Sequence, residues 1–276
     1  MAVKFDEIGY WSEIKLDIVS EYAAAYSRIM SKQSLIRGYY YIDAFAGGGI
    51  HISKRTQEFV LGSPLNALQI IPPFTGYYFI DLDGDKVGLL RELTADYENV
   101  VVDEGDCNII LSQKVLPSIR FDEYKRALCL LDPYGLDLDW SVLHTAGQSG
   151  VVEVFLNFPV MDMNRNVFWC CPENVDPAQI PRMNAFWGDE SWIQAAYKRT
   201  DGLFGKIEEK MPNDVIAQAY RDRLRSAAGF AYVPEPIPMR NTKGAIVYYL
   251  FFASPNKTGA KIVGDIFKKY ESMGME

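Results

Sequence analysis

The sequence is poor in residues that ligate transition metals. Its 276 residues include four cysteines and two histidines, and the cysteines at positions 107, 129, 170 and 171 form no Cys-x-x-Cys pair. Structural zinc sites need closely spaced pairs of Cys or His ligands. The sequence therefore argues against a structural zinc site, and we expect no bound metal and reduced thiols.

Long apolar runs are also missing. No run approaches the roughly 20 apolar residues that a membrane-spanning helix needs, and the first residues lack the pattern of a secretory signal. We therefore expect a cytoplasmic protein without membrane contact.

Positive charge is in deficit. The chain has 28 Lys and Arg against 36 Asp and Glu, which gives a net charge of -8. Sequence-independent binding to nucleic acid depends on clustered Lys and Arg. The balance argues against long DNA as a partner and leaves a small molecule, a nucleotide or a compact RNA element open.

Two phosphate-binding motifs are absent, the GxGxxG fingerprint and the P-loop lysine, but a different glycine turn is present. An apolar run from Tyr39 ends at Asp43, and Ala44-Phe45-Ala46 then leads into three glycines. This pattern is typical of the first strand and turn of an open α/β sheet. A carboxylate before the glycines disfavours phosphates and favours a cationic, hydroxyl-rich ligand such as S-adenosylmethionine (SAM), although a tight turn without any ligand is the alternative. We predict that the cofactor-binding residues of this turn are Asp43, Phe45, Ala46, Gly47 and Gly49.

Expected strands and helices alternate along the rest of the chain. We predict strands at 39–45, 76–81, 99–103, 127–131 and 151–156, with helices at 11–30, from 63, 84–97 and 108–117. Ser12 and Ser63 are expected N-caps, with Pro64 at the first helical position. Near-continuous apolar strands between helices indicate a doubly wound, mostly parallel, Rossmann-like sheet covered on both faces.

The pattern changes after Pro159. Residues 160–212 are rich in aromatics and prolines and predict an α-rich insertion, or lid, over the carboxyl edge of the sheet. A helix at 214–228, an antiparallel pair at 230–233 and 246–253, and a helix at 258–270 are expected to follow. We treat residues 1–276 as a single domain with the insertion inside it.

The expected strands all end in polar residues at one edge, where doubly wound sheets bind ligands. We predict that Asp81 accepts the ribose hydroxyls of an adenosine, beside Leu82, while Asp83 can cap the next helix. Asp106 is expected to accept the adenine amino group beside Cys107, with Asn108 as the cap of the following helix. Each acid taken singly can equally be a cap or a solvated loop residue.

The fourth strand ends in Asp132-Pro133-Tyr134, which partly matches the acid-Pro-Pro-aromatic motif of amino-group methyltransferases. Proline stiffens the turn, an aromatic ring stacks on a planar substrate, and an acid accepts a hydrogen bond from the target amine. We predict Asp132, Pro133 and Tyr134 as catalytic residues, although a simple strand-to-loop turn is the alternative. Tyr134, Asn157, Phe158 and the aromatics of the insertion are expected to bind the substrate.

Several motifs spread along the chain together resemble the three-Cys-motif partner protein family. These motifs are Trp11-Ser-Glu-Ile-Lys15-Leu, Tyr22, Tyr41-Ile-Asp-Ala-Phe-Ala-Gly47, Gly62-Ser-Pro-Leu-Asn-Ala-Leu68, Leu131-Asp-Pro-Tyr-Gly135, Asn157-Phe-Pro159 and Phe186-Trp-Gly-Asp-Glu-Ser-Trp192. Gly48 departs from the family pattern, in which proline is common.

The resemblance implies a class I SAM-dependent methyltransferase-like fold with seven strands, the last pair antiparallel. It also implies a radical-SAM-like protein as partner, and that neighbour, not this chain, carries the three cysteines of the family name. Together with a resemblance to ribosomal-RNA adenine methyltransferases, it implies that Lys15 contacts the cofactor's carboxylate. Ser63 joins the expected cofactor-binding residues.

Three functional interpretations follow. The first is a SAM-dependent methyltransferase acting on a nitrogen of a nucleobase-like or other planar acceptor. The second is a non-catalytic module that supports a radical-SAM-like protein. The third is a magnesium-dependent nuclease or nucleotide-processing enzyme that uses Asp81, Asp83, Asp106 and Asp132 as ligands.

Overall fold

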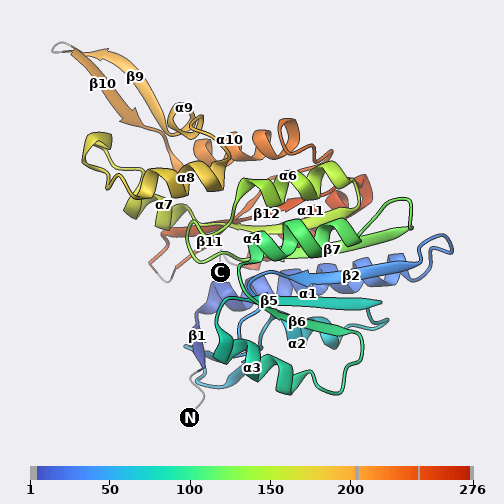
Figure 1. The fold of residues 1–276 in the computed structure, drawn as a ribbon. Coiled ribbons are helices and arrows are strands. Elements are labelled where there is room, and N and C mark those ends of the chain that lie inside the picture. The colour runs from blue at the N-terminus through green and yellow to red at the C-terminus, as the bar shows by residue number, and fades with distance from the viewer. Residues whose placement is uncertain (1–4, 203–204, 242, 274–276) are drawn as a thin grey trace.

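The structure is a computed structural model, and it describes residues 5–202, 205–241 and 243–273. In this part of the chain a seven-stranded sheet forms the centre of the molecule, in the order β11-β12-β8-β7-β2-β5-β6 (Figure 1). The strands are β2 (Gly38–Asp43), β5 (Gly76–Asp81), β6 (Val100–Glu104), β7 (Lys125–Leu131), β8 (Val152–Phe158), β11 (Ile237–Arg240) and β12 (Ile246–Ala253).

The strand directions confirm the expected mostly parallel, doubly wound sheet. β2, β5, β6, β7 and β8 pair in parallel, while β12 is antiparallel to both β8 and β11. The chain runs from β2 outward to β6, then returns to β7 on the other side of β2. The switch point therefore lies between β2 and β7, the place where doubly wound sheets bind ligands.

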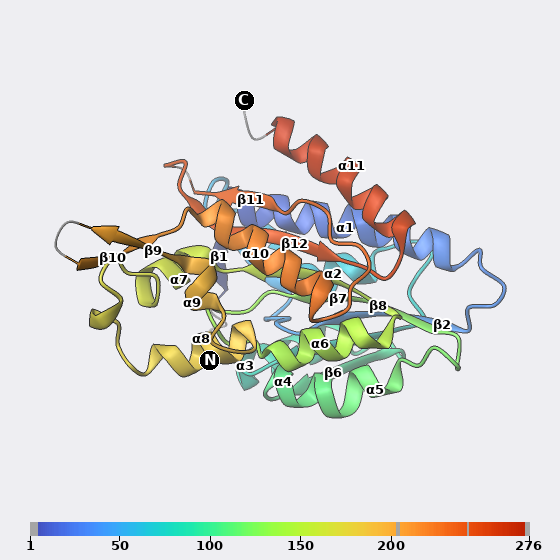
Figure 2. The same ribbon diagram turned by 90° about the horizontal axis from the view of Figure 1, so that it is seen from above.

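Helices cover both faces of the sheet (Figure 2). One face carries α1 (Tyr10–Met30), α2 (Ser63–Leu68), α3 (Gly84–Leu93) and α11 (Lys257–Met273). The other carries α6 (Trp140–Ser149), α10 (Asn213–Ser226) and a continuous helical segment made of α4 (Cys107–Ile110), the π-helical turn η1 (Leu111–Val115) and α5 (Leu116–Ser118).

Alternation along the strands explains the two cores. Leu128 and Leu130 of β7 pack with α1 on one face, whereas Ala127, Cys129 and Leu131 pack with the α6 layer on the other. Successive side chains of a strand point to opposite faces, so a strand buried on both sides must be apolar throughout. The near-continuous apolar runs of the sequence are the result.

The insertion after β8 is mixed rather than purely helical. It contains α7 (Val160–Asn166), the 3-10 turn η2 (Pro172–Asn174), α8 (Gln179–Trp187), α9 (Trp192–Ala196) and a hairpin of β9 (Tyr197–Gly202) and β10 (Gly205–Lys210). The hairpin, which the sequence did not predict, extends away from the sheet in both views (Figures 1 and 2). Phe186, Trp187 and Trp192 are buried in the α6-side core. The prediction that these aromatics bind substrate is therefore wrong.

A small second sheet was also unpredicted. It joins β1 (Asp6–Ile8), β3 (Ile50–Ser53) and β4 (Phe59–Leu61), so the segment after the glycine turn forms a short hairpin before α2. Lys86 of α3 donates to Asp6 at 2.6 Å and fixes this sheet beside the carboxyl edge of the main one.

Three local predictions are corrected. The strand that pairs with β12 is Ile237–Arg240, not 230–233, where only Tyr232 makes an isolated bridge to Ser254. Gly9 and Gly62, rather than Ser12 and Ser63, occupy the N-cap positions of α1 and α2, without side-chain caps. α1 begins at Tyr10, one residue before the predicted start, and α2 begins at Ser63 itself, so each serine lies inside its helix.

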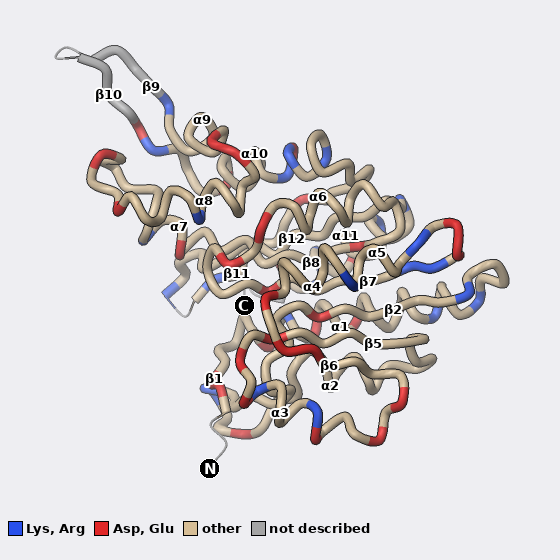
Figure 3. The backbone as a smooth tube through the Cα atoms, in the orientation of Figure 1, with Lys and Arg blue, Asp and Glu red and all other residues tan. Residues whose placement is uncertain are grey.

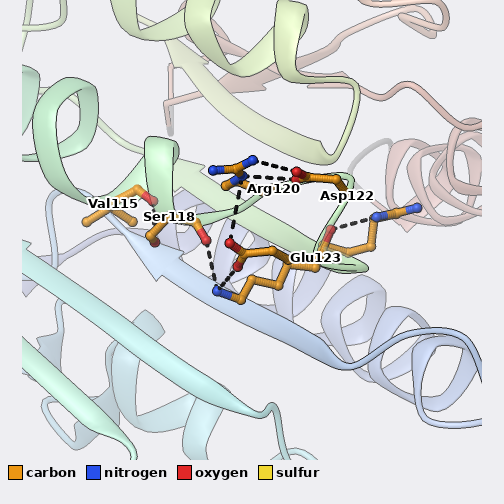
Figure 4. Close-up of polar contacts among 7 residues, drawn as sticks. Val115, Ser118, Arg120, Asp122 and Glu123 are labelled. Atoms are coloured by element: carbon orange, nitrogen blue, oxygen red, sulfur yellow. Dashed lines mark hydrogen bonds and ion pairs between the residues drawn. The ribbon is translucent and has the colours of Figure 1, made fainter.

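At the opposite, amino edge of the sheet, a polar network shapes the turn into β7 (Figure 4). Arg120 donates to Asp122 and pairs with Glu123, and Lys125 reaches the Ser118 carbonyl at 3.2 Å and Glu123.

Within the described ranges, no helix combines the length and the apolar character needed to cross a membrane.

Candidate functional site

A cavity of about 720 Å³ opens at the carboxyl ends of β2, β5, β6 and β7. Acidic segments follow β5 and β6 at this edge (Figure 3). Six of the predicted site residues line the cavity, namely Phe45, Asp81, Leu82, Asp106, Cys107 and Tyr134. The other predicted site residues, among them Asp43, Asp132 and Asn157, are not in its wall.

Asp81 fixes the conformation of the glycine turn. Its Oδ2 accepts a hydrogen bond from the Gly47 amide at 2.7 Å, and its Oδ1 accepts one from the Asp83 amide at 3.0 Å. Gly47 and Gly49 have φ of 62° and 80°, a region that favours glycine. Each carboxylate oxygen keeps a second lone pair, so Asp81 can still accept hydroxyl groups from a ligand.

Asp43 lies completely buried beneath this turn. Burial raises its pKa to about 7, the Asp132 carboxylate adds to the rise, and the Ser63 hydroxyl, the Phe45 amide and Lys15 lower it. Its Oδ1 accepts from the Phe45 amide at 3.3 Å, whereas its Oδ2 has no hydrogen-bond partner among the described residues. The Ser63 hydroxyl, whose hydrogen bond lowers the pKa of Asp43, is a side-chain donor to this carboxylate.

Asp132, at the end of β7, is held by two side chains. The Lys15 ammonium forms an ion pair with its Oδ2, and Asn157 Nδ2 donates to its Oδ1 at 2.7 Å. Lys15 is buried and its Nζ lies 5.5 Å from the centroid of the Tyr248 ring. These contacts hold the Asp132 carboxylate as an oriented hydrogen-bond acceptor.

Asn157 brings a second unfilled acceptor to this place. Its Oδ1 is buried and, in the residues that the structure describes, receives no hydrogen bond. Asp43 and Asn157 lie near the carboxyl ends of β2 and β8, and Asp132 directly follows the neighbouring strand β7, so all three are at one edge. They form an acceptor-rich group beside the glycine turn.

Tyr134 and Pro133 differ in exposure. Pro133 is buried in the turn, while Tyr134 is 61% exposed on the cavity rim, with the Lys86 ammonium 5.6 Å from its ring centroid. An exposed aromatic ring at a cavity mouth can stack on a planar ligand.

The helix caps were predicted in part. Asp83 caps α3, as expected, by accepting from the amides of Asp85 and Lys86. Asp106, not Asn108, caps α4, with the Asn108 amide donating at 2.8 Å. The Asn108 side chain instead bonds the backbone of the loop at 137–139.

Phe158 is not a substrate contact. It is fully buried, and its ring packs 4.7 Å from the Tyr220 ring and 5.5 Å from the Phe251 ring, measured between centroids. It lies inside β8, where alternation directs it into the core. The prediction for Phe158 is wrong.

Other residues at the cavity were missed or left undecided. Lys86 and Arg182 line it, and Arg182 of α8 bonds Asp137 at 2.8 Å across its rim. The sequence analysis missed Lys86 because its local sequence is that of an ordinary helix lysine. It missed Arg182 because no local pattern shows that the insertion lies beside Asp137. His51 lies in β3 beside the turn, where burial lowers its pKa.

Cys107 and the remaining carboxylates bear on two chemical questions. Burial raises the pKa of the Cys107 thiol to about 12, so it borders the cavity as an apolar group. Across the described ranges no three His, Cys, Asp or Glu side chains come together as a metal site. The four acids of the magnesium interpretation each have a different partner: the Gly47 amide for Asp81, the Asp85 amide for Asp83, the Asn108 amide for Asp106 and the Lys15 ammonium for Asp132. The magnesium interpretation therefore lacks its ligand cluster.

A scan of protein-family models and a search of curated protein sequences found no match. Solved structures do match. Protein LPL1258 from Legionella pneumophila is 10% identical, with 95% of this chain and 91% of that chain covered, at a TM-score of 0.52. Trm1 from Pyrococcus horikoshii in complex with S-adenosyl-L-methionine is 10% identical (91% and 58% covered, TM-score 0.44), and the N-terminal domain of EvdMO1 with SAH and D-fucose is 10% identical (86% and 82% covered, TM-score 0.41).

The strand order and directions agree with this likeness in fold. β2, β5 and β6 form one half of the sheet, β7 and β8 the other, and the antiparallel β12 lies between β8 and β11. The chain has a Rossmann-like fold, a doubly wound and mostly parallel seven-stranded sheet with an antiparallel last pair.

Proposed function

We propose that the chain is a SAM-dependent methyltransferase that methylates a nitrogen of a planar acceptor. The observation that carries this proposal is the hydrogen bond from the Gly47 amide to Asp81 at the edge of the switch-point cavity, because it sets an acid beside the glycine turn, where one bound cofactor would meet both. The cavity, at about 720 Å³, lies within the range of small-molecule and cofactor sites.

The lining fits the parts of SAM. Asp81 is placed to accept ribose hydroxyls, Leu82 is 76% exposed and offers an apolar surface to adenine, and Asp106 keeps acceptor capacity for an amino group. Bound SAM supplies a methyl group on a sulfonium, activated for in-line displacement.

The residues of this chain would orient the acceptor. Asp132, fixed by Lys15 and Asn157, and the unfilled Oδ1 of Asn157 accept hydrogen bonds from an amino group, and Tyr134 stacks on its ring. Holding the nitrogen lone pair toward the methyl group supplies most of the acceleration. Asp132 can also take the amine proton as transfer proceeds.

The acceptor class and the partner follow from the net charge and from the sequence resemblance. The net charge of -8 favours a small molecule, a nucleotide or compact RNA over long DNA. The resemblance to three-Cys-motif partner proteins supports a radical-SAM-like protein as partner.

Calorimetric titration with SAM and with its demethylated product tests the proposal. We expect binding that Asp81→Asn weakens at least about tenfold, while the matched variant Asp85→Asn, at an exposed carboxylate of α3 outside the cavity wall, binds within about threefold of wild type. Absence of binding to the folded chain would refute a cofactor site that is complete in this chain. It would favour the non-catalytic module, which keeps the fold and needs its partner.

A further inference from the structure

A second cavity, of about 290 Å³, lies at the amino edge of the sheet, opposite the proposed cofactor site. Its walls are the amino ends of β7 and β8, the last turns of α1 and the loop that leads into α11. Neither the fold nor the proposed methyl transfer requires a cavity here.

Tyr26 of α1 lines this cavity and is only 3% exposed. Its hydroxyl has no hydrogen-bond partner within the described part of the chain. Burial raises the pKa of Tyr26 well above its ordinary value, the Glu153 carboxylate adds to the rise, and Arg126 opposes it. The hydroxyl therefore lies near two charged residues of the cavity wall, and a buried hydroxyl without a bond costs about 1–3 kcal/mol.

Two basic residues belong to the wall of the same cavity. Arg126 and Lys257 line the cavity, and one of the five N–H donors of Arg126 is used by the Lys125 carbonyl at 2.7 Å. The 17-residue helix α11 begins at Lys257, and Asn256 before it accepts from the Thr258 amide at 2.8 Å. A helix N-terminus carries a partial positive charge and binds anions.

Glu153 is the one acid in the cavity wall described here. Both of its oxygens are occupied, Oε2 by the Tyr22 hydroxyl and Oε1 by the Ser254 hydroxyl at 2.9 Å. Burial raises its pKa to about 7, although the two hydroxyls lower it. Near neutral pH a large share of this side chain is uncharged, so it opposes an anion only in part.

We propose that this cavity binds a small oxyanion, a phosphate or carboxylate group, through Arg126, the Tyr26 hydroxyl and the amino end of α11. The anion would supply the acceptor that the Tyr26 hydroxyl lacks and would be held by charge-assisted bonds from the guanidinium. This site does not depend on the proposed function.

Titration of the full chain with inorganic phosphate, and separately with acetate, tests the site at constant ionic strength. We compare wild type with Arg126→Gln and Tyr26→Phe. The matched control is Arg120→Gln, a basic residue of the same edge that is paired with Asp122 and Glu123 outside the cavity (Figure 4). Thermal unfolding confirms that each variant is folded.

We expect saturable binding of at least one anion, weakened about tenfold or more by Arg126→Gln, several-fold by Tyr26→Phe and not by Arg120→Gln. The anion that binds more tightly assigns the group as phosphate or carboxylate. No saturation by either anion below about 10 mM, or an equal loss in all three variants, overturns the proposal. SAM binding reports on the other edge and separates a failure here from a failure of the proposed function.

Discussion

Lys15 and Asp132 form an ion pair across the carboxyl edge of the sheet although they are 117 positions apart in the chain. The Lys15 side chain is 9% exposed and that of Asp132 is 28% exposed. The lysine that the family resemblance assigned to the cofactor's carboxylate thus holds the proposed orienting acid. The first helix contributes to the acceptor side of the site.

The strength of this pair can be measured without any substrate. We predict that a double-mutant cycle of Lys15→Gln and Asp132→Asn gives a coupling of about 1–3 kcal/mol in the free energy of unfolding, since removal of one partner leaves a poorly solvated charge. The exposed pair Lys269–Glu21, at 2.7 Å, is the matched control and should couple by less than about 1 kcal/mol. Equal couplings would show that burial adds nothing to the Lys15–Asp132 pair.

Tyr134 should act on the acceptor more than on the cofactor. With an acceptor found by screening, Tyr134→Ala is expected to lower kcat/KM about tenfold or more through lost stacking, while Tyr134→Phe retains most activity. Tyr97→Ala, an exposed tyrosine that is not in the cavity wall, is the control. Steady-state kinetics together with SAM titration check this, and an unchanged KM and kcat in Tyr134→Ala would contradict it.

Asp43 makes stability depend on pH. Its folded pKa is about 7 and its ordinary value is 3.8, so its contribution to stability is full below about pH 4 and is lost as the pH rises through 7. We therefore predict that the free energy of unfolding of Asp43→Asn, measured relative to wild type, increases from pH 5 to pH 8. The increase should be on the order of 1 kcal/mol or more, given roughly 1.4 kcal/mol per pKa unit. Urea unfolding at the two pH values measures the difference, and a constant difference would contradict the prediction.

Two glycine substitutions should have opposite effects. Gly49 has φ of 80°, and an added Cβ would lie 3.0 Å from Leu90 and 3.3 Å from Leu65, so Gly49→Ala is expected to destabilise by about 1–3 kcal/mol. Gly88 lies in α3 with nothing within 4 Å of an added Cβ, so Gly88→Ala should stabilise by about 0.5–1 kcal/mol. Thermal or urea unfolding distinguishes the two variants. Loss of stability in both would show that the positive φ of Gly49 does not decide the effect.

The sequence predicted the sheet well for a physical reason. Apolar runs with polar ends mark buried parallel strands, and β5 and β12 were predicted with their observed bounds. Phe45, Asp81 and Tyr134 were placed at the cavity because they follow strands. Periodicity and strand ends are local signals, and the carboxyl edge collects them in one place.

The failures concern partners distant in the chain. Phe158 was assigned to the substrate because it lies near a strand end, yet its neighbours Tyr220 and Phe251 come from α10 and β12. The Lys15–Asp132 pair and the Arg182–Asp137 bond join elements whose contact depends on the complete fold. The hairpin of β9 and β10 was missed because the insertion was predicted from its aromatic and proline content. That content does not distinguish a strand from a helix.

Helix α1 reaches both edges of the sheet. Lys15, near its beginning, bonds Asp132, while Tyr26, in its last turns, lines the cavity at the other edge. The two residues are 11 positions apart, which corresponds to about 16 Å along the helix axis. A sliding or tilting of this helix would alter the orientation of Asp132 and the shape of the distant cavity together, so the two edges of the molecule are not mechanically independent.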